Sequence, residues 1–115
     1  MKNMDTFNAL AEPTRRTILE RLAARGSMSA TDIYRGFKSS PPAISQHLKV
    51  LRDTKLVRVE KRAQQRIYYV NPEPMKELEK WIKQFGAQME EQFTALDRLL
   101  ETEKAKLLKN KKEKK

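Results

Sequence analysis

The sequence predicts a mainly α-helical domain with one small β-hairpin, followed by a long helix. Three observations lead to this fold class. Between residues 7 and 53, apolar residues recur every three or four positions in short stretches bounded by helix start and stop signals. Residues 56–70 change to the alternation that is typical of strands, around a polar centre. From residue 75 to residue 100 the helical spacing returns and continues without a break.

The first two helices lie before Gly26. Phe7, Leu10 and Ala11 form the apolar stripe of a short first helix. Pro13 suits the first turn of the second helix, where a backbone N–H has no partner within the helix. Gly26 is well placed as the C-terminal stop of that helix.

The next two helices begin at serine caps. Residues 29–32 (Ser-Ala-Thr-Asp) resemble a capping box with Asp32 in the third helical position, which predicts a short helix through Phe37. Ser40 can cap the following helix, whose first turn contains Pro41 and Pro42 and which ends near residue 53. We expect this fourth helix to bury the stripe at residues 44, 48 and 51.

The rest of the chain forms a hairpin and one long helix. Residues 56–60 and 67–70 are expected to be its two strands, and residues 71–74 (Asn-Pro-Glu-Pro) end the second strand. The long helix has about 30 residues, and the tail from Lys104 is expected to be disordered because it is lysine-rich. We therefore expect one domain over residues 1–103 and a disordered tail over 104–115. The apolar stripe of the long helix consists of Met75, Leu78, Ile82, Phe85, Met89, Phe93, Leu96 and Leu100.

Composition narrows the class of protein. The chain has 115 residues, no cysteine and a net charge of +10. Residues 34–70 hold nine Lys or Arg against two Asp or Glu, residues 71–103 hold four against eight, and residues 104–115 hold seven against one. Basic segments attract polyanions, which favours a nucleic-acid partner over a generally basic protein. No apolar stretch approaches the ~20 residues that span a bilayer, so we expect a soluble intracellular protein without membrane contact.

The order helix, turn, helix and hairpin corresponds to the winged helix-turn-helix plan, in which the last helix of the motif reads the major groove. Opposite its buried stripe, this helix carries short polar, amide and cationic groups suited to base edges and phosphates, although an ordinary solvated face would look similar. The hairpin tip is polar and cationic, as a wing on the phosphate backbone would be, although a plain exposed turn is the alternative. Tyr68 and Tyr69 point to opposite faces, and the pattern does not say which is buried. The candidate DNA-binding residues are Ser40, Pro42, Ser45, Gln46, His47, Lys49, Arg62, Gln64, Gln65 and Arg66.

His47 is the only histidine. One imidazole without cysteine cannot form a tetrahedral metal site within one chain, so we interpret it as a structural or backbone-contacting residue and predict no metal and no cofactor. Ser45 and His47 are two residues apart on one helix and point in different directions, and no glycine-rich phosphate loop is present. We expect no enzymatic activity.

The long helix has more apolar surface than a small domain can cover, which favours a homodimer, although its first half can pack on its own subunit. The predicted interface residues are Phe7, Leu10, Leu78, Trp81, Ile82, Phe85, Met89, Phe93 and Leu96.

Several segments resemble the ArsR family of prokaryotic repressors. They are residues 7–16 (Phe-Asn-Ala-Leu-Ala-Glu-Pro-Thr-Arg-Arg), residues 42–51 (Pro-Ala-Ile-Ser-Gln-His-Leu-Lys-Val-Leu) and Leu56-Val57. The ending, with Tyr68 to Pro72 and then Trp81, Phe85 and Leu96, is similar to the branch of the family without metal sites. The resemblance covers about residues 4–100. It implies a cytoplasmic, nucleoid-associated homodimer that represses transcription by binding an inverted repeat in double-stranded DNA.

Three positions depart from the family pattern. The third helix has no cysteine pair and the last helix has no histidine, so metal sensing of the family type is not expected. Lys55 stands where the family usually has Gly, which costs roughly 1 kcal/mol if the backbone there is left-handed. Ala63-Gln64 replaces the usual Gly-Arg at the wing tip.

Two alternatives to a repressor remain: a sequence-indifferent DNA-binding protein, and a protein-interaction module that uses the long helix. No small-molecule effector is identified.

Overall fold

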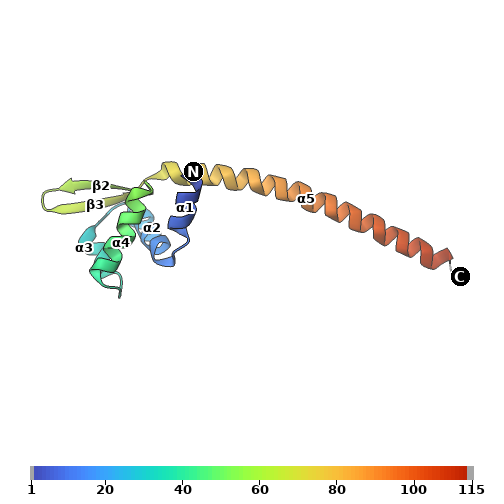
Figure 1. Ribbon diagram of the computed structural model, residues 1–115, viewed down its shortest axis with the longest axis horizontal. Helices are drawn as coiled ribbons and strands as arrows, with labels where there is room; N and C mark the ends of the chain where they lie inside the picture. Colours follow the sequence, from blue (N-terminus) through green and yellow to red (C-terminus); the bar gives the residue numbers. More distant parts are fainter. Residues whose placement is uncertain (1, 114–115) are drawn as a thin grey trace. The chain divides into compact units, whose positions relative to one another are not determined.

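The computed structural model describes residues 2–113, and side-chain burial is described for residues 5–110 (Figure 1). The chain divides into two units, one up to Glu79 and one from Lys80, and each is described by itself. The predicted class, mostly helical with a small antiparallel sheet, is confirmed. The elements in chain order are α1 (Lys2–Leu10), α2 (Pro13–Arg25), β1 (Met28–Ser29), α3 (Ala30–Arg35), α4 (Pro41–Asp53), β2 (Val57–Arg62), β3 (Gln65–Val70) and α5 (Pro72–Glu113).

The connection between α1 and α2 is held by charged side chains. Glu12 is the N-cap of α2 and accepts a hydrogen bond from the backbone N–H of Arg15 at 3.1 Å, and Pro13 occupies the first turn as predicted. The Arg15 guanidinium donates to the carbonyls of Ala9 and Asn8 at 2.7 and 2.9 Å. The Arg16 guanidinium donates to the carbonyl of Leu10 at 2.6 Å. These carbonyls end α1 and have no partner within the helix, so the two arginines stabilise its C-terminus.

The caps of the later helices agree with the sequence. Gly26 ends α2 with φ 85°, a left-handed conformation that glycine adopts without steric cost, and donates to the Leu22 carbonyl. Ser29 caps α3 and its hydroxyl accepts from the backbone N–H of Asp32 at 3.1 Å. Ser40 caps α4, where its hydroxyl accepts from the N–H of Ala43 at 3.4 Å. The predicted starts of both helices are therefore confirmed.

The sheet has three strands rather than the two that the hairpin predicts. β2 and β3 pair from Val57–Val70 to Arg62–Gln65, and β1 adds to the other edge of β3, with Met28 opposite Tyr68. All pairs are antiparallel. β1 has two residues, which is too short to show an alternating pattern, so its sequence carried no strand signal.

Two residues in and beside the hairpin have positive φ. Lys55, before β2, has φ 62°, and Ala63, in the two-residue turn, has φ 54°. Lys55 therefore meets the condition under which a non-glycine residue costs roughly 1 kcal/mol at this position. The Asn71 side chain donates to the Lys55 carbonyl at 2.8 Å, and the Asn71 backbone N–H donates to the carbonyl of Leu56. These contacts hold the two ends of the hairpin together, where its chain enters and leaves.

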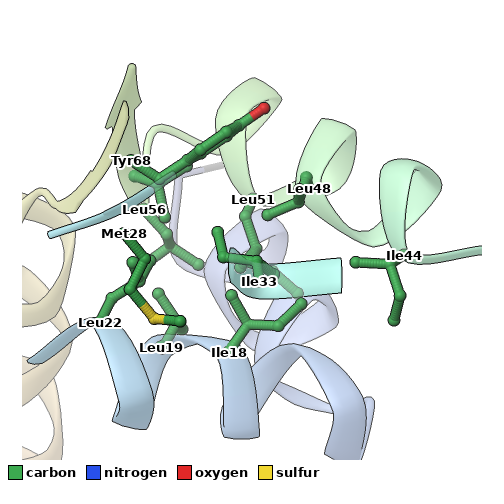
Figure 2. Close-up of a cluster of buried hydrophobic side chains, with 12 residues drawn as sticks. Ile18, Leu19, Leu22, Met28, Ile33, Ile44, Leu48, Leu51, Leu56 and Tyr68 are labelled. Carbon is green, nitrogen blue, oxygen red and sulfur yellow. The ribbon is translucent and has the colours of Figure 1, made fainter. Parts of the chain in front are cut away.

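The core of the first unit lies between α2, α3, α4 and the sheet. Figure 2 shows the α4 side chains on one side of this cluster and those of α2 on the other, with Ile33 of α3 between them. Burying six such side chains completely provides the main favourable term for folding. The fully buried large residues are Ile18, Leu22, Ile33, Ile44, Leu51 and Leu56.

α5 is longer than predicted. It has 42 residues, and its last turns include residues 104–113, where the sequence favours disorder. Alanine, leucine and lysine have high helix propensity, which explains why a lysine-rich segment continues a helix. Leu78 is buried within the first unit. No helix in the described part of the chain is long and apolar enough to cross a membrane.

Candidate nucleic-acid interface

α4 has two chemically different faces. Ile44, Leu48 and Leu51 are at most 2% exposed and attach the helix to the core, as the sequence predicts. Pro42, Ser45, Gln46 and Lys49 are all exposed. Ser40 is exposed as well, but its hydroxyl is occupied as the cap. The three buried residues therefore hold the backbone while a short polar and cationic surface faces solvent.

His47 lies on the flank between these faces and contacts α2. Its Nδ1 atom is 3.3 Å from a guanidinium nitrogen of Arg15 and 3.7 Å from a carboxylate oxygen of Glu12. Its side chain is 23% exposed. Because Arg15 also binds the end of α1, this group of three side chains joins α1, α2 and α4. His47 thus has a positioning contact besides any contact with DNA.

The electrostatics of this group favour an ionised Glu12. Desolvation raises the pKa of Glu12, but the backbone N–H of Arg15, the charge of His47 and the hydrogen bonds of Thr14 lower it. The net result is a pKa below the ordinary value of a glutamate. The carboxylate at the N-terminus of α2 also interacts favourably with the helix dipole.

The hairpin presents its charges on two faces. Side chains of a strand alternate, so Arg66 and Tyr68 share one face of β3, and Lys61, paired with Arg66, shares it too. Arg62 and Gln65 lie on the other face. Tyr68 is the buried tyrosine of the pair, at 5% exposure, which answers the question that the sequence left open.

Arg62 has a partner within the hairpin. Its guanidinium is 3.3 Å from a carboxylate oxygen of Glu60, which also accepts a hydrogen bond from the Tyr69 hydroxyl at 3.1 Å. The structure therefore does not bring all the predicted wing residues together. Arg66 lies on the face that continues toward α4, Gln64 lies in the turn, and Arg62 and Gln65 lie on the opposite face.

Arg52 was missed by the sequence reasoning. It is exposed on α4, three residues after Lys49. Residues three apart are neighbours on a helix surface, so the spacing alone would have placed Arg52 beside Lys49. The polar face of α4 is consequently longer and more basic than predicted.

The predicted dimer-interface residues fall into three groups. Phe7, Leu10 and Met89 are half-buried. Leu78 is covered by its own chain, so it adds little to an exposed apolar surface, and its place in an interface stays a prediction. The remaining residues are 40–52% exposed: Trp81, Ile82, Phe85, Phe93 and Leu96. Trp81 and Phe85 stack on each other with ring centroids 5.2 Å apart.

Comparison with known proteins identifies the family. Residues 10–60 match a family described as a helix-turn-helix domain. An uncharacterized HTH-type transcriptional regulator of Methanocaldococcus jannaschii is 35% identical over 81 residues, which cover 70% of this chain and 91% of the relative. The transcriptional repressor SdpR of Bacillus subtilis is 33% identical over 81 residues, covering 70% and 89%. The crystal structure of an ArsR family transcriptional regulator, RHA00566, has 29% identity and a TM-score of 0.71, covering 77% of this chain and 91% of that one.

The chain belongs to the ArsR family. Its winged helix-turn-helix fold and its role as a transcriptional regulator with a DNA-binding helix-turn-helix follow from this membership. The match to the helix-turn-helix family runs from the end of α1 into β2 and contains all of α4. The ArsR relatives are regulators by name, which points to a role other than catalysis.

Proposed function

We propose that this ArsR-family protein is a homodimeric repressor that binds an inverted-repeat operator through residues 41–53 of α4 and a wing formed by residues 57–70. The observation that carries the proposal is the division of α4 into a buried stripe and an exposed polar face. A helix held by Ile44, Leu48 and Leu51 can enter a major groove without unfolding its core contacts.

The exposed groups of α4 have the chemistry for reading bases. Gln46 can form two hydrogen bonds with adenine, and Ser45 adapts to a donor or an acceptor. Lys49 reaches guanine or a phosphate. Wing cations such as Arg66 bind phosphates, which position the protein but do not select a sequence. Specificity is therefore assigned to Ser45, Gln46 and Lys49.

Exposed apolar residues on the second unit support a homodimer. Nine large apolar side chains between Trp81 and Leu108 are exposed in the single chain. Extended exposed apolar surface of this kind marks an interaction site. A two-fold dimer presents two reading helices to successive major grooves about 34–36 Å apart, which requires a palindromic operator. The name of SdpR, a transcriptional repressor, supports repression rather than activation.

We propose that regulation does not depend on a metal. The sequence has no cysteine, and its one histidine contacts Arg15 and Glu12. Among the side chains of residues 5–110, no group of three or more His, Cys, Asp or Glu is placed to hold a metal ion.

Selection of bound DNA from a random pool tests the proposal. The expected result is an enriched palindrome whose half-sites are one helical turn apart, about 10 base pairs. Binding of the selected duplex and of a random duplex is then measured over a range of salt concentrations. Equal affinity for both duplexes at every salt concentration contradicts the proposal and favours a sequence-indifferent DNA-binding protein.

A further inference from the structure

A small hollow lies on the polar side of α4, where α3, α4 and β3 meet. Its volume is about 140 Å³. Tyr34 of α3 and Tyr68 of β3 are among its lining residues, and in Figure 2 the Tyr68 ring extends toward α4 with its hydroxyl oxygen at the tip. Gln46 lies at the same hollow, so it adjoins the face that we assign to base recognition.

Three cationic side chains converge on this hollow. Lys49 and Arg52 come from one face of α4, and Arg66 comes from β3. No carboxylate is among the residues that line it. Like charges repel, so this arrangement costs free energy unless an anion occupies the space between the cations.

These three cations have no carboxylate partner in the described part of the chain, in contrast to some other cations on the surface. Arg35 pairs with Asp32, and Arg62 pairs with Glu60. No ion pair among residues 5–110 involves Lys49, Arg52 or Arg66. Their charge is therefore available to a ligand.

The positions of the three cations follow from regular geometry. Lys49 and Arg52 are three residues apart on a helix, and Arg66 and Tyr68 are two residues apart on a strand. Leu48 and Tyr68, both buried, anchor the two elements to the core on either side of the hollow. The site is thus built on rigid backbone and not on a mobile loop.

We propose that this hollow binds one phosphate of the DNA backbone, held jointly by Arg52 and Arg66 with Lys49 beside them. Guanidinium groups bind phosphate oxygens through paired N–H donors, and the tyrosine hydroxyls add neutral donors. One phosphate held by both α4 and the wing positions the protein on the DNA backbone without selecting a sequence. The inference rests on the proposed DNA-binding function and names a contact within it.

Charge-removing variants test the site. Arg52→Gln and Arg66→Gln are each expected to weaken binding about tenfold, by the same factor for the selected and the random duplex. Each is also expected to make the slope of log K against log salt concentration shallower by about 0.9, the value for one phosphate contact. Because both arginines hold the same phosphate, the double variant is expected to lose much less than the product of the two single losses. Both side chains are exposed, and unchanged thermal unfolding confirms that each variant folds.

Arg58→Gln is the matched control. Arg58 is an exposed arginine of the same hairpin that is not among the candidate DNA-binding residues. It lies opposite Tyr69 and therefore on the other face from Arg66. Its loss is expected to change affinity by less than about twofold, because it removes only long-range attraction. An equal effect of Arg58→Gln and Arg52→Gln overturns the proposal, since a general loss of charge then explains both.

Neutral phosphates locate the contact on the DNA. Single methylphosphonate substitutions are scanned through the selected duplex, and one position in each half-site is expected to weaken wild-type binding yet have little further effect on the double variant. If the two arginines respond to different positions, or if their losses multiply, no shared phosphate exists and the proposal is wrong. Inorganic phosphate is compared with chloride at equal ionic strength. The hollow holds free phosphate instead if two results are found together. Inorganic phosphate then releases the wild type from DNA but not the double variant, and no methylphosphonate position affects the wild type more than the double variant.

The outcome is separable from that of the proposed function. If the wild type prefers no sequence, the repressor proposal fails, but the arginine variants still report on a phosphate contact with random DNA. If the wild type prefers a palindrome and the arginine variants behave like Arg58→Gln, only the phosphate site fails.

Discussion

Lys55 and Ala63 show how single residues of this chain depart from their local preference. Both have positive φ, at 62° and 54°, without being glycine. A Cβ atom in the left-handed region contacts the backbone, which costs about 1 kcal/mol relative to glycine. The two residues precede and close the hairpin, so the strain lies where the wing begins and where it turns.

Lys55→Gly is expected to stabilise the protein by about 1 kcal/mol because it removes this contact. The free energy of unfolding is measured with urea. Lys55→Ala, which removes the same charge but keeps the Cβ atom, is the matched control and is expected to give no gain. Equal gains for the alanine and glycine variants would show that charge, and not backbone conformation, limits stability at this position.

Gln46 is the residue to which base selection is assigned most directly. Gln46→Ala is expected to reduce the discrimination between the selected and random duplexes by about 1–3 kcal/mol, while folding remains intact because the side chain is exposed. Fluorescence anisotropy with both duplexes measures this difference. The control is Leu48→Ala, which removes a buried side chain and is expected to lower the free energy of unfolding by ~2–5 kcal/mol. Unchanged operator preference in Gln46→Ala would mean that another face reads the DNA.

At the scale of elements, the N-terminus of α2 connects three helices. Arg15 donates to the last carbonyls of α1 and contacts His47 of α4, while Glu12 caps α2 and lies 3.7 Å from the same histidine. The reading helix is therefore positioned by polar contacts at its flank as well as by its buried stripe. Residues 12–16 of the family-like segment thus have a structural role that their charge alone does not suggest.

Glu12→Gln is expected to destabilise the protein at about pH 7 and to matter less in acid. The pKa of Glu12 is lowered in the folded state, so the ionised carboxylate stabilises the fold above its ordinary pKa, about 4.3. That contribution is lost as the pH falls through the lower folded pKa, because the wild-type side chain then becomes neutral as well. Urea unfolding at a series of pH values measures the gap between wild type and variant, which is expected to narrow below about pH 4.

Glu20→Gln is the control for the general loss of one negative charge, since Glu20 is exposed on α2. A gap for Glu12→Gln that stays constant from neutral to acidic pH would show that the carboxylate charge does not contribute through these contacts.

At the scale of the whole molecule, exposed apolar side chains and positive charge are concentrated in different segments of the chain. The second unit exposes large apolar side chains from Trp81 to Leu108, while residues 34–70 contain most of the excess positive charge of the first unit. In the proposed homodimer, most of the self-association surface therefore lies in the second unit and the basic DNA-binding surface lies in the first. The proposed dimer would cover the exposed apolar surface and present two basic surfaces.

Phe93→Asp is expected to raise the dissociation constant of the homodimer about 10–100-fold. Phe93 is 52% exposed in one chain, and a carboxylate there opposes burial of a side chain worth about 1.5–3 kcal/mol. Analytical ultracentrifugation at several concentrations measures the change. The adjacent Gln92→Asp, a polar and exposed position, is the control for added charge. A wild-type chain that is monomeric at micromolar concentration would contradict the homodimer itself and favour an interaction module for another protein.

Most elements could be predicted because their signals are local. Caps at Ser29 and Ser40, the stop at Gly26 and the stripe of Ile44, Leu48 and Leu51 all depend on residues within a few positions of each other. β1 could not be predicted, because two residues carry no period and their pairing with β3 is a contact across about 40 residues of sequence. The end of α5 was predicted too early because lysine content was interpreted as disorder, whereas lysine also favours a helix.

The sequence by itself determined the order of the elements, the buried and exposed faces of α4 and the basic character of the hairpin, since periodicity and capping depend on neighbours along the chain. Only the tertiary structure decided that Tyr68 is the buried tyrosine, that Leu78 is covered by its own chain and that Arg62 pairs with Glu60. It also brought Arg66 to Lys49 and Arg52. These contacts and burials depend on which face of each strand meets the core and on which elements are neighbours in space. Tertiary packing decides both, because it brings together residues that are distant in the sequence.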